Sequence, residues 1–465
     1  MDEIPGWVRE GLPQPNAWTT LSRAQTLWSA LLIAAVACAF LLWPGQTFLW
    51  LNTAFIVLYL VFSHYKLFLQ FLSIGQEPGT PLPEGASAFH WPAYTIMVPL
   101  YREAAALPGL IDHLAGLDYP TDKLQILLLV EEDDEETRAV LERRAPGLPF
   151  EVIGVPASLP RTKPKACDWG LRHARGELLV IYDAEDRPER DQLKKAALCF
   201  SQAPEDVACL QARLDFYNPQ RNLITRLFTA EYASWFGLCL PGLHMLDAPI
   251  PLGGTSNHFK LCVLRRLRGW DPFNVTEDCD LGVRLYLQGY RTLPLDSTTW
   301  EEAAFRLWPW IRQRSRWFKG YLQTYLVHMR QQGALFRRGG IHSLFHFQMI
   351  FGANCFCLLM NPFYWVLTAV WLTTRSEFVS SFYPLWVLIP ALLSFLAGNA
   401  AFVLSTMIAC VERKHYWLVP LCLLTPFYWV LMSLGAWKGA LQLVTQPFYW
   451  EKTPHEGAAF LEDGT

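Results

Sequence analysis

Two acidic stretches carry side chains that could act on a phosphorylated substrate. Asp183-Ala184-Glu185-Asp186 follows a hydrophobic run, and carboxylates this close together can converge on a hard divalent cation, which prefers oxygen ligands. Such a cation would bridge the phosphates of a nucleotide. The second stretch, Glu131 to Asp134, gives a weaker indication. The alternative for the first is a solvated acidic turn that caps a helix, and for the second a merely exposed loop.

Two lysines and a later acidic triplet extend this set. Lys163 and Lys165 stand in a Pro-stiffened loop before a predicted helix, a setting that suits phosphate binding, although a solvated basic loop is the alternative. Thr276-Glu277-Asp278 precedes a predicted helix from Leu281 to Gln288. Asp278 could act as a general base on a hydroxyl nucleophile. Alternatively, the acids of this triplet only favour the helix N-terminus, with Thr276 or Asn274 as its cap.

A basic and aromatic stretch lies further along, from Phe305 to Gln323. It could place cations beside an anionic leaving group, or it could be an amphipathic helix on a membrane surface with snorkelling basic residues. Both interpretations can hold together. Its basic members are Arg306, Arg312, Arg314, Arg316 and Lys319, and they alternate with Trp308, Trp310, Trp317 and Phe318.

The acidic stretches follow predicted strands. Strands are expected at 94–100, 124–130, 150–155 and 177–182, where β-branched and apolar residues form short runs. They alternate with predicted helices, which favours a mostly parallel α/β sheet with helices on both faces. In such sheets ligands bind at the carboxyl ends of the strands. Glu131 and Asp183 both stand at strand ends, so we expect a site there.

Long apolar runs on either side of this block indicate a membrane protein. Hydrophobic residues make up 52% of the 465 residues and charged residues only 17%, whereas globular domains carry about 25% charged. Runs at 26–43, 48–72, 343–372 and 382–410 are long enough to span a bilayer. The predicted organisation is a transmembrane hairpin (1–74), a linker (75–90), an α/β domain (91–300), interfacial helices (301–340), two transmembrane helices (341–411), a re-entrant or interfacial segment (412–445) and a cytosolic tail (446–465).

Net charge and cysteine usage narrow the functional class. A net charge of −3 argues against nucleic acid as a partner. The 11 cysteines are scattered, without CxxC pairs or metal-ligand spacing, which indicates reduced thiols in a chain facing the cytosol. Basic flanks and connections place the α/β domain in the cytosol by the positive-inside rule.

These motifs, taken in order, resemble the membrane-embedded family-2 glycosyltransferases, which include bacterial cellulose and hyaluronan synthases. Within this family, the chain most resembles the branch of bacterial exopolysaccharide synthases that includes the phage-receptor-type inner-membrane synthases. The series that carries the resemblance is Val98-Pro99, Glu131, Lys165-Ala166, Asp183-Ala184-Glu185-Asp186, Thr276-Glu277-Asp278, and Gln313-x-x-Arg316-Trp317. The resemblance implies a GT-A fold, a UDP-sugar donor, Mg²⁺ or Mn²⁺ as cofactor, and a location in the bacterial inner membrane as a multi-pass protein.

The resemblance also implies roles for individual residues. Asp278 would be the base, with Glu277 and Thr276 beside it. Donor contacts would come from Pro99, Tyr101, Glu131, Lys165, Asp183, Gln313, Arg316 and Trp317, and the metal would be held by Asp183 and Glu185. Acceptor contacts would come from Gly254, Thr255, Ser256, Asn257, His258 and Trp317, and a gating loop from Trp450, Lys452, Thr453 and His455.

The chain also departs from the family pattern. The metal motif is Asp-Ala-Glu rather than Asp-x-Asp, and Glu131 and Asp168 replace residues that are Asp and Asn in many relatives. No cyclic-di-GMP-binding module is expected after the tail, so regulation through it would need a partner chain.

Three functions follow as expectations. The first is a processive inverting β-glycosyltransferase that polymerises a UDP-sugar and passes the growing polysaccharide across the inner membrane, with a periplasmic or outer-membrane export partner or a regulatory subunit. The second is a non-processive transferase that loads one sugar onto a lipid. The third is a non-catalytic receptor or transporter component, which the combined presence of Asp183, Glu185, Asp278 and Arg316 disfavours.

Overall fold

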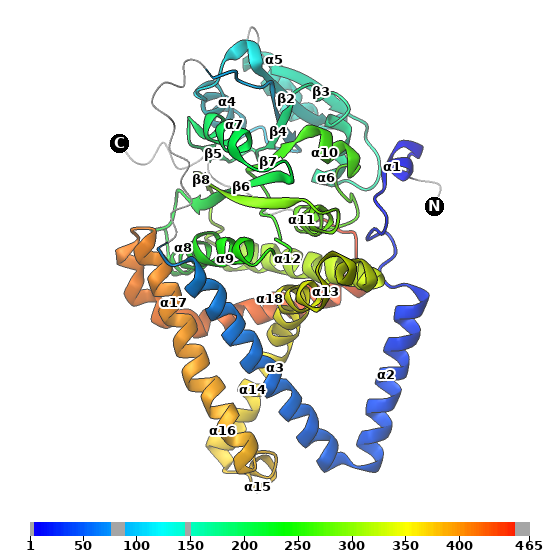
Figure 1. Cartoon of the computed structure of the whole chain (residues 1–465), viewed down its shortest axis with the longest axis vertical. Coiled ribbons are helices and arrows are strands. Elements are labelled where there is room, and N and C mark those ends of the chain that lie inside the picture. The colour runs from blue at the N-terminus through cyan, green and yellow to red at the C-terminus, as the bar shows by residue number, and fades with distance from the viewer. Residues whose placement is uncertain (1–3, 76–88, 145–149, 452–465) are drawn as a thin grey trace.

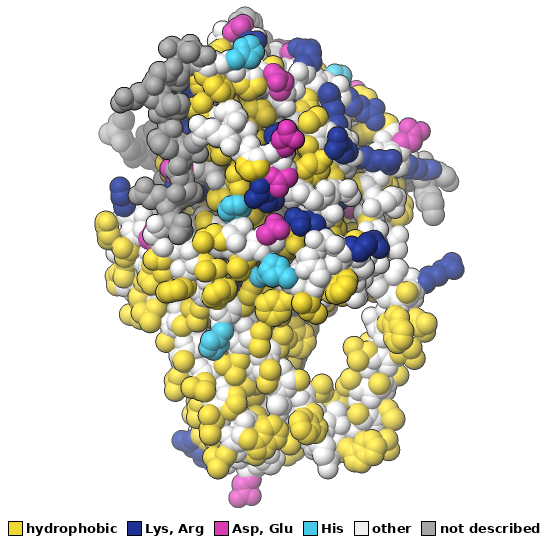
Figure 2. Space-filling view, in the orientation of Figure 1, with side chains coloured by type: hydrophobic (Ala, Val, Ile, Leu, Met, Phe, Trp, Pro, Cys, Tyr) yellow, Lys and Arg dark blue, Asp and Glu magenta, His cyan; other side chains and the backbone are white. Residues whose placement is uncertain are grey.

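The computed structural model describes residues 4–75, 89–144 and 150–451. An α/β domain occupies one end of the molecule, and long helices extend from its underside (Figure 1). Hydrophobic side chains dominate the surface of these long helices, whereas charged side chains gather over the α/β domain (Figure 2). The molecule is therefore divided into a polar part and an apolar part.

One sheet of eight strands forms the α/β domain, in the order β3-β2-β1-β4-β7-β6-β8-β5. β1 pairs in parallel with β2 and β4, and β2 with β3, so this half is the parallel sheet that the sequence predicts. β7 is antiparallel to β4 and β6, which makes the whole sheet mixed. The strands are β1 (Tyr94–Leu100), β2 (Leu124–Glu131), β3 (Phe150–Val155), β4 (Leu178–Ile181), β5 (Arg187–Pro188), β6 (Val207–Phe216), β7 (Asn257–Lys260) and β8 (Arg291–Glu301).

The central strands are buried on both faces of the sheet, and successive side chains of a strand point to opposite faces. In β1, Ile96 and Val98 belong to one apolar cluster and Met97 belongs to another. Helices on the two faces cover these clusters, which explains why the central strands are continuous apolar runs. The helices of this domain are α4 (Leu107–Ala115), α5 (Glu135–Arg144), α6 (Lys163–Gly170), α7 (Gln192–Gln202), α10 (Leu261–Arg266) and α11 (Glu277–Leu287), with a 3₁₀ turn η2 (Thr121–Lys123).

A second set of helices lies across the underside of the sheet (Figure 1). α12 and α18 pack closely, because a Cβ atom on Gly439 of α18 would lie 2.5 Å from Ser315 O of α12. The bounds of this set are α8 (Leu223–Ser234), η3 (Trp235–Cys239), α9 (Leu240–Met245), α12 (Leu307–His328) and α18 (Thr425–Thr445), and a short helix α1 (Gly6–Gly11) begins the described chain. α12 contains most of the basic and aromatic stretch for which the sequence predicts an amphipathic helix.

The long helices that leave the underside are apolar. Within the described residues, five helical stretches are long and apolar enough to cross a membrane: Arg23–Leu42, Pro44–Ser73, Leu307–Thr374, Leu385–Glu412 and Tyr416–Thr445. Their elements are α2 (Arg23–Leu42), α3 (Pro44–Ser73), η4 (Met329–Gln331), α13 (Gln332–Phe347), η5 (Gln348–Ala353), α14 (Asn354–Thr374), α15 (Glu377–Ser380), α16 (Leu385–Leu393), η6 (Ser394–Gly398), α17 (Asn399–Glu412) and η7 (Tyr416–Leu424). The predicted domain boundaries, including an interfacial 412–445, stay predictions.

Candidate active site

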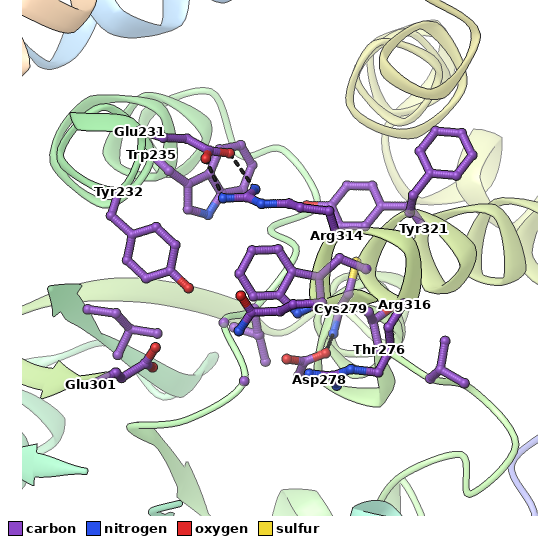
Figure 3. A pocket seen from close by; sticks show the side chains of 18 of the residues that line it. Glu231, Tyr232, Trp235, Thr276, Asp278, Cys279, Glu301, Arg314, Arg316 and Tyr321 are labelled. Atoms are coloured by element: carbon purple, nitrogen blue, oxygen red, sulfur yellow. Dashed lines mark hydrogen bonds and ion pairs between the residues drawn. The ribbon is translucent and has the colours of Figure 1, made fainter. Parts of the chain in front are cut away.

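A cavity of about 520 Å³ lies between the carboxyl ends of the strands and the underside helices. It brings together thirteen of the residues expected from the sequence, although these are far apart along the chain. Figure 3 shows part of its wall, with Asp278, Arg316 and Glu301 among the labelled side chains. The thirteen are Pro99, Tyr101, Glu131, Asp183, Glu185, Gly254, Thr276, Glu277, Asp278, Gln313, Arg316, Trp317 and Trp450.

Lys165 does not line this cavity, although the sequence assigns it to the donor diphosphate. Its side chain is fully buried and pairs with Glu131, Nζ to Oε2, at 2.9 Å. Nζ also donates to the carbonyl oxygens of Pro156 and Ser158 at 3.0 and 3.1 Å. An ammonium has three hydrogens to donate, so all three are used within the fold. In this structure Lys165 supports Glu131 rather than facing a ligand.

Lys163, two residues earlier, lines the cavity instead. Its Nζ forms an ion pair with Asp183 and donates to Gly254 O at 2.7 Å. Burial lowers the pKa of Lys163, but the nearby carboxylates of Asp183 and Glu277 raise it above its ordinary value overall. The cation thus stays protonated between the end of β4 and the acidic triplet, where a phosphate could bind. α6 begins at Lys163, with Pro164 in its first turn, where proline is favoured.

Four carboxyl groups meet at the end of β4. Asp183, Glu185 and Glu301 line the cavity, and burial together with the charges of Asp186, Glu185 and Asp183 raises the pKa of Glu301 well above its ordinary value. Asp186 is buried, and its Oδ2 accepts hydrogen bonds from the Asp183 amide and the Thr255 hydroxyl. The Oδ1 of Asp186 has no partner among the described residues. This local excess of negative charge would be relieved by a divalent cation.

The same residues fit a metal that is bound together with its substrate. Within the described chain, no group of three or more His, Cys, Asp or Glu side chains is arranged to hold a metal ion by itself. Mg²⁺ is usually bound by one or two carboxylates plus substrate phosphates. Asp183 and Glu185 could supply those two carboxylates, as the sequence suggests, and the donor would supply the remaining ligands.

The acidic triplet begins α11. Thr276 occupies the N-cap position without a capping hydrogen bond from its side chain. Asp278 Oδ1 accepts a hydrogen bond from the Cys279 amide at 2.7 Å. Burial raises the pKa of Asp278, while that amide, Lys163 and Arg316 oppose the increase. Burial and the charge of Asp278 raise the pKa of Glu277 to about 8. With a pKa of about 8, Glu277 is therefore largely protonated near neutral pH.

α12 contributes the opposite wall through Gln313, Arg316 and Trp317. The Nε of Arg316 and the Oε1 of Gln313 are buried without hydrogen-bond partners among the described residues. The guanidinium carbon of Arg316 lies 4.6 Å from the ring centre of Trp450. Polar atoms that lack protein partners in a cavity wall are available to a ligand.

The ion pair between Arg314 and Glu231 orients the ring of Trp317. Arg314 donates two hydrogen bonds to Glu231 of α8, at 2.7 and 2.5 Å, and a third to Tyr428 of α18 at 3.0 Å. The guanidinium carbon lies 4.7 Å from the ring centre of Trp317, and the Tyr232 ring stacks on Trp317 with 6.3 Å between ring centres. Figure 3 shows the hydrogen bonds between Arg314 and Glu231 as dashed lines. Three helices therefore hold the Trp317 ring in place.

Of the expected acceptor residues, Gly254 and Trp317 line the cavity. A Cβ atom on Gly254 would lie 3.4 Å from Asp278 Oδ2, so this residue lies directly against the acid. Thr255, Ser256, Asn257 and His258 are buried behind it and are not part of the cavity wall. Asn257 stabilises the loop that carries Gly254, because its Nδ2 donates to Gly253 O at 2.6 Å. Of the expected gating residues, Trp450 lines the cavity, and Lys452, Thr453 and His455 lie outside the described residues.

The N-terminal segment supports the loop that precedes α11. The Ala17 amide donates to Asp271 Oδ2 at 2.5 Å. Trp18 packs edge-on against Phe273, with 4.4 Å between ring centres, and stacks against Phe448. The polar, Pro-rich start of the chain therefore helps to position the acidic triplet.

Several cavity residues were missed from the sequence. Glu301 ends β8, a strand that the sequence analysis did not predict, so its position at the site had no local signal. Glu231, Tyr232 and Trp235 lie on α8 and η3, which carry no motif. The sequence indicates both Lys163 and Lys165 as candidates for phosphate binding, but the family resemblance assigns the donor contact to Lys165 alone.

Comparison with known families identifies the chain. The model for glycosyl transferase family group 2 matches residues 178–432, and that for glycosyl transferase family 2 matches residues 95–258. The first match covers more than half of the chain. The chain belongs to glycosyl transferase family group 2. This family-2 enzyme is thus a nucleotide-sugar hexosyltransferase, which confirms the resemblance found in the sequence.

Three individual relatives each share less than 30% sequence identity with this chain. The chain is 24% identical to the probable glycosyltransferase YdaM of Bacillus subtilis over 64% of this chain and 70% of that protein. It is 27% identical to the cellulose synthase 1 catalytic subunit (UDP-forming) of Komagataeibacter xylinus over 68% of this chain and 44% of that protein. It is also 27% identical to the beta-monoglucosyldiacylglycerol synthase of Synechocystis over 56% of this chain and 55% of that protein.

Solved structures confirm the fold class. The mannosyltransferase PcManGT from Pyrobaculum calidifontis, solved in complex with GDP-Man and Mn²⁺, superposes with a TM-score of 0.55 at 20% identity. The superposition covers 85% of this glycosyltransferase and 99% of that chain. At this identity the likeness concerns the fold, which is GT-A with a mixed, mostly parallel sheet, as the sequence predicts.

Proposed function

We propose that this glycosyltransferase is a processive, inverting β-glycosyltransferase that polymerises a UDP-activated sugar and passes the product through its membrane helices. One observation carries the proposal. A single cavity contacts both the carboxylates at the strand ends, such as Asp183, and the membrane-directed helices α3, α14 and α17. An acceptor can therefore reach Asp278 from the membrane side while a nucleotide binds from the sheet side.

The proposed reaction assigns one role to each wall of the cavity. Asp278 removes the proton from the acceptor hydroxyl, which attacks the anomeric carbon in line with the departing diphosphate. Lys163 and Arg316 bind the developing negative charge of that diphosphate. A divalent cation held by Asp183 and Glu185 would neutralise the phosphates when bound. Trp317 provides an aromatic face on which the terminal sugar of the acceptor can stack.

A second candidate is transfer of one sugar to a lipid acceptor. The part of the cavity between the membrane-directed helices is largely apolar, with Leu358, Phe402, Trp429 and Met432 in its wall, and an acyl chain could occupy it. The relatives are compatible with both candidate functions. One is named as a cellulose synthase catalytic subunit and another as a beta-monoglucosyldiacylglycerol synthase.

Product analysis separates these functions. The full-length protein, purified in detergent, is supplied with radiolabelled UDP-sugars and Mg²⁺ in the presence of a bacterial lipid extract. Products that lengthen with time and resist chloroform extraction support the polymerase. A single labelled lipid species supports the second candidate and overturns processivity. No turnover with any nucleotide-sugar would favour a non-catalytic role.

A further inference from the structure

The cavity has a charged residue in its membrane part that the proposed reaction does not use. Lys66 of α3 lines the cavity, seven residues before the end of the helix at Ser73, which corresponds to about 10 Å of helix rise. That end packs against η3, because Ser73 Oγ donates to Leu238 O at 2.7 Å. Lys66 therefore lies in the part of a membrane-capable helix that is nearest the α/β domain.

No carboxylate of the described residues forms an ion pair with this lysine. Among the described residues, Lys66 forms neither an ion pair nor a hydrogen bond, and its Nζ lies 5.1 and 5.9 Å from the ring centres of Phe62 and Phe402. An ionisable residue at membrane depth is costly, and such residues usually pair with another group or mark a ligand path. Two aromatic faces offset only part of this cost. The cavity beside Lys66 is thus suited to an anion.

A second unsatisfied group lies one turn further along the same face of α3. Gln70 is 4% exposed and lines the cavity. Its Nε2 donates to Ser234 Oγ at 2.8 Å, whereas its Oε1 has no hydrogen-bond partner among the described residues. A buried acceptor without a donor costs about 1–3 kcal/mol. A ligand that carries a hydroxyl would satisfy it.

Together these two residues define the chemistry of the ligand. Lys66 requires an anionic oxygen and Gln70 requires a hydroxyl donor, while Phe402, Trp429 and Met432 offer apolar surface beside them. We propose that Lys66 and Gln70 bind the head of an anionic amphiphile, a phosphate-linked polyol or sugar on a lipid tail, which carries the acceptor hydroxyl to Asp278. This inference rests on the second candidate under the proposed function, transfer to a lipid acceptor, because it takes the membrane part of the cavity as the acceptor path.

Lipid binding by the full-length protein tests the site. Native mass spectrometry in detergent compares three lipids with the same acyl chains: phosphatidylglycerol, which has phosphate and head hydroxyls, phosphatidic acid, which has phosphate alone, and diacylglycerol, which has a hydroxyl alone. Phosphatidylglycerol should bind about ten-fold more tightly than diacylglycerol, because a hydrogen bond to a charged group is worth about one factor of ten or more. Lys66→Met should abolish this preference, and Lys66→Arg should retain it.

Further variants keep the test specific. Gln70→Leu should remove the preference for phosphatidylglycerol over phosphatidic acid while both still exceed diacylglycerol. Lys414→Met removes an exposed cation outside the cavity and should leave all three affinities unchanged. Wild-type binding of phosphatidylglycerol by Lys66→Met, or an equal loss in Lys414→Met, would overturn the site. Equal competition by free glycerol 3-phosphate would show that a soluble phosphate is the ligand and would overturn the lipid assignment.

The same preparations separate this inference from the proposed function. UDP affinity and sugar transfer are measured beside lipid binding. If Lys66→Met loses lipid binding but the wild type transfers sugar to no acceptor, the proposed function fails and the lipid site stands. If the wild type transfers sugar and Lys66→Met transfers it to the same lipid products at the same KM for the acceptor, only this inference fails.

Discussion

Lys163 and Gly254 are joined by a hydrogen bond of 2.7 Å from the lysine Nζ to the glycine carbonyl oxygen. The same ammonium pairs with Asp183. The bond links the start of α6 to the loop that lies against Asp278, so one cation connects the expected phosphate site with the expected base. A diphosphate that replaced Asp183 as the partner of Lys163 would therefore bind next to the reacting centre.

This arrangement distinguishes two neighbouring lysines. Lys163→Met should weaken UDP binding about ten-fold, because it removes one charge-assisted contact, and should leave thermal unfolding near that of the wild type. Lys165→Met should instead lower the free energy of unfolding by about 3–5 kcal/mol, because it leaves buried Glu131 without its cation. Calorimetric titration with UDP and thermal unfolding in detergent measure the two effects. Loss of UDP binding by Lys165→Met with a wild-type melting temperature would contradict the assignment.

Asp278→Asn should lower the transfer rate by about 10²- to 10⁴-fold, the usual contribution of a general base. UDP binding should persist, because no phosphate contact is assigned to Asp278. Initial rates with a radiolabelled donor and titration with UDP make the comparison. Asp296→Asn removes a half-exposed carboxylate outside the cavity and serves as the matched control. Retained transfer by Asp278→Asn would disprove its role as the base.

Glu277 should make the fold sensitive to pH. Its pKa is about 8 in the folded protein and about 4.3 in an unfolded chain, so the folded state binds more protons between these values. The free energy of unfolding should therefore fall as pH rises from about 4 to 8. Glu277→Gln should flatten this dependence and raise the melting temperature at pH 8 relative to the wild type. Exposed Glu205→Gln should leave the slope unchanged, and the same slope in Glu277→Gln would refute the linkage.

Removal of divalent cations should abolish transfer and weaken UDP binding, since Asp183 and Glu185 alone leave the phosphates unneutralised. Treatment with EDTA, followed by addition of Mg²⁺ or Mn²⁺, tests this with the same two measurements. Asp183→Asn should require a higher metal concentration for half-maximal activity. Full activity in EDTA would argue that Lys163 and Arg316 suffice and that no metal takes part.

The Arg314 ion pair should affect the acceptor more than the donor. Arg314→Lys cannot reproduce the two parallel hydrogen bonds to Glu231, so Trp317 should lose its fixed orientation. The KM for the acceptor should rise by about ten-fold, the equivalent of one charge-assisted contact. UDP affinity is the internal control and should not change. A KM for the acceptor like that of the wild type would show that Trp317 is held without this pair.

Much of the fold follows from local sequence signals. β1 and β3 coincide with the expected strands, and β2 extends the expected strand by one residue, because apolar β-branched runs between polar turns have few other solutions. The acidic residues after β2 and β4 mark the strand ends where a site forms. β6 and β8 were missed, since these two strands are neighbours in the sheet but are far apart in the sequence, so no local pattern indicates their pairing.

The chain's residue types and their order thus determined the GT-A class, the enzyme family and the acidic and basic members of the site. Only the tertiary structure decided which members meet. It turned Lys163 toward the cavity and buried Lys165 on Glu131, because positions two residues apart in a helical turn point to different sides of the helix. It also brought Glu301 and Gln70 to the same cavity from elements without motifs. Long-range packing places such side chains, and no local pattern encodes it.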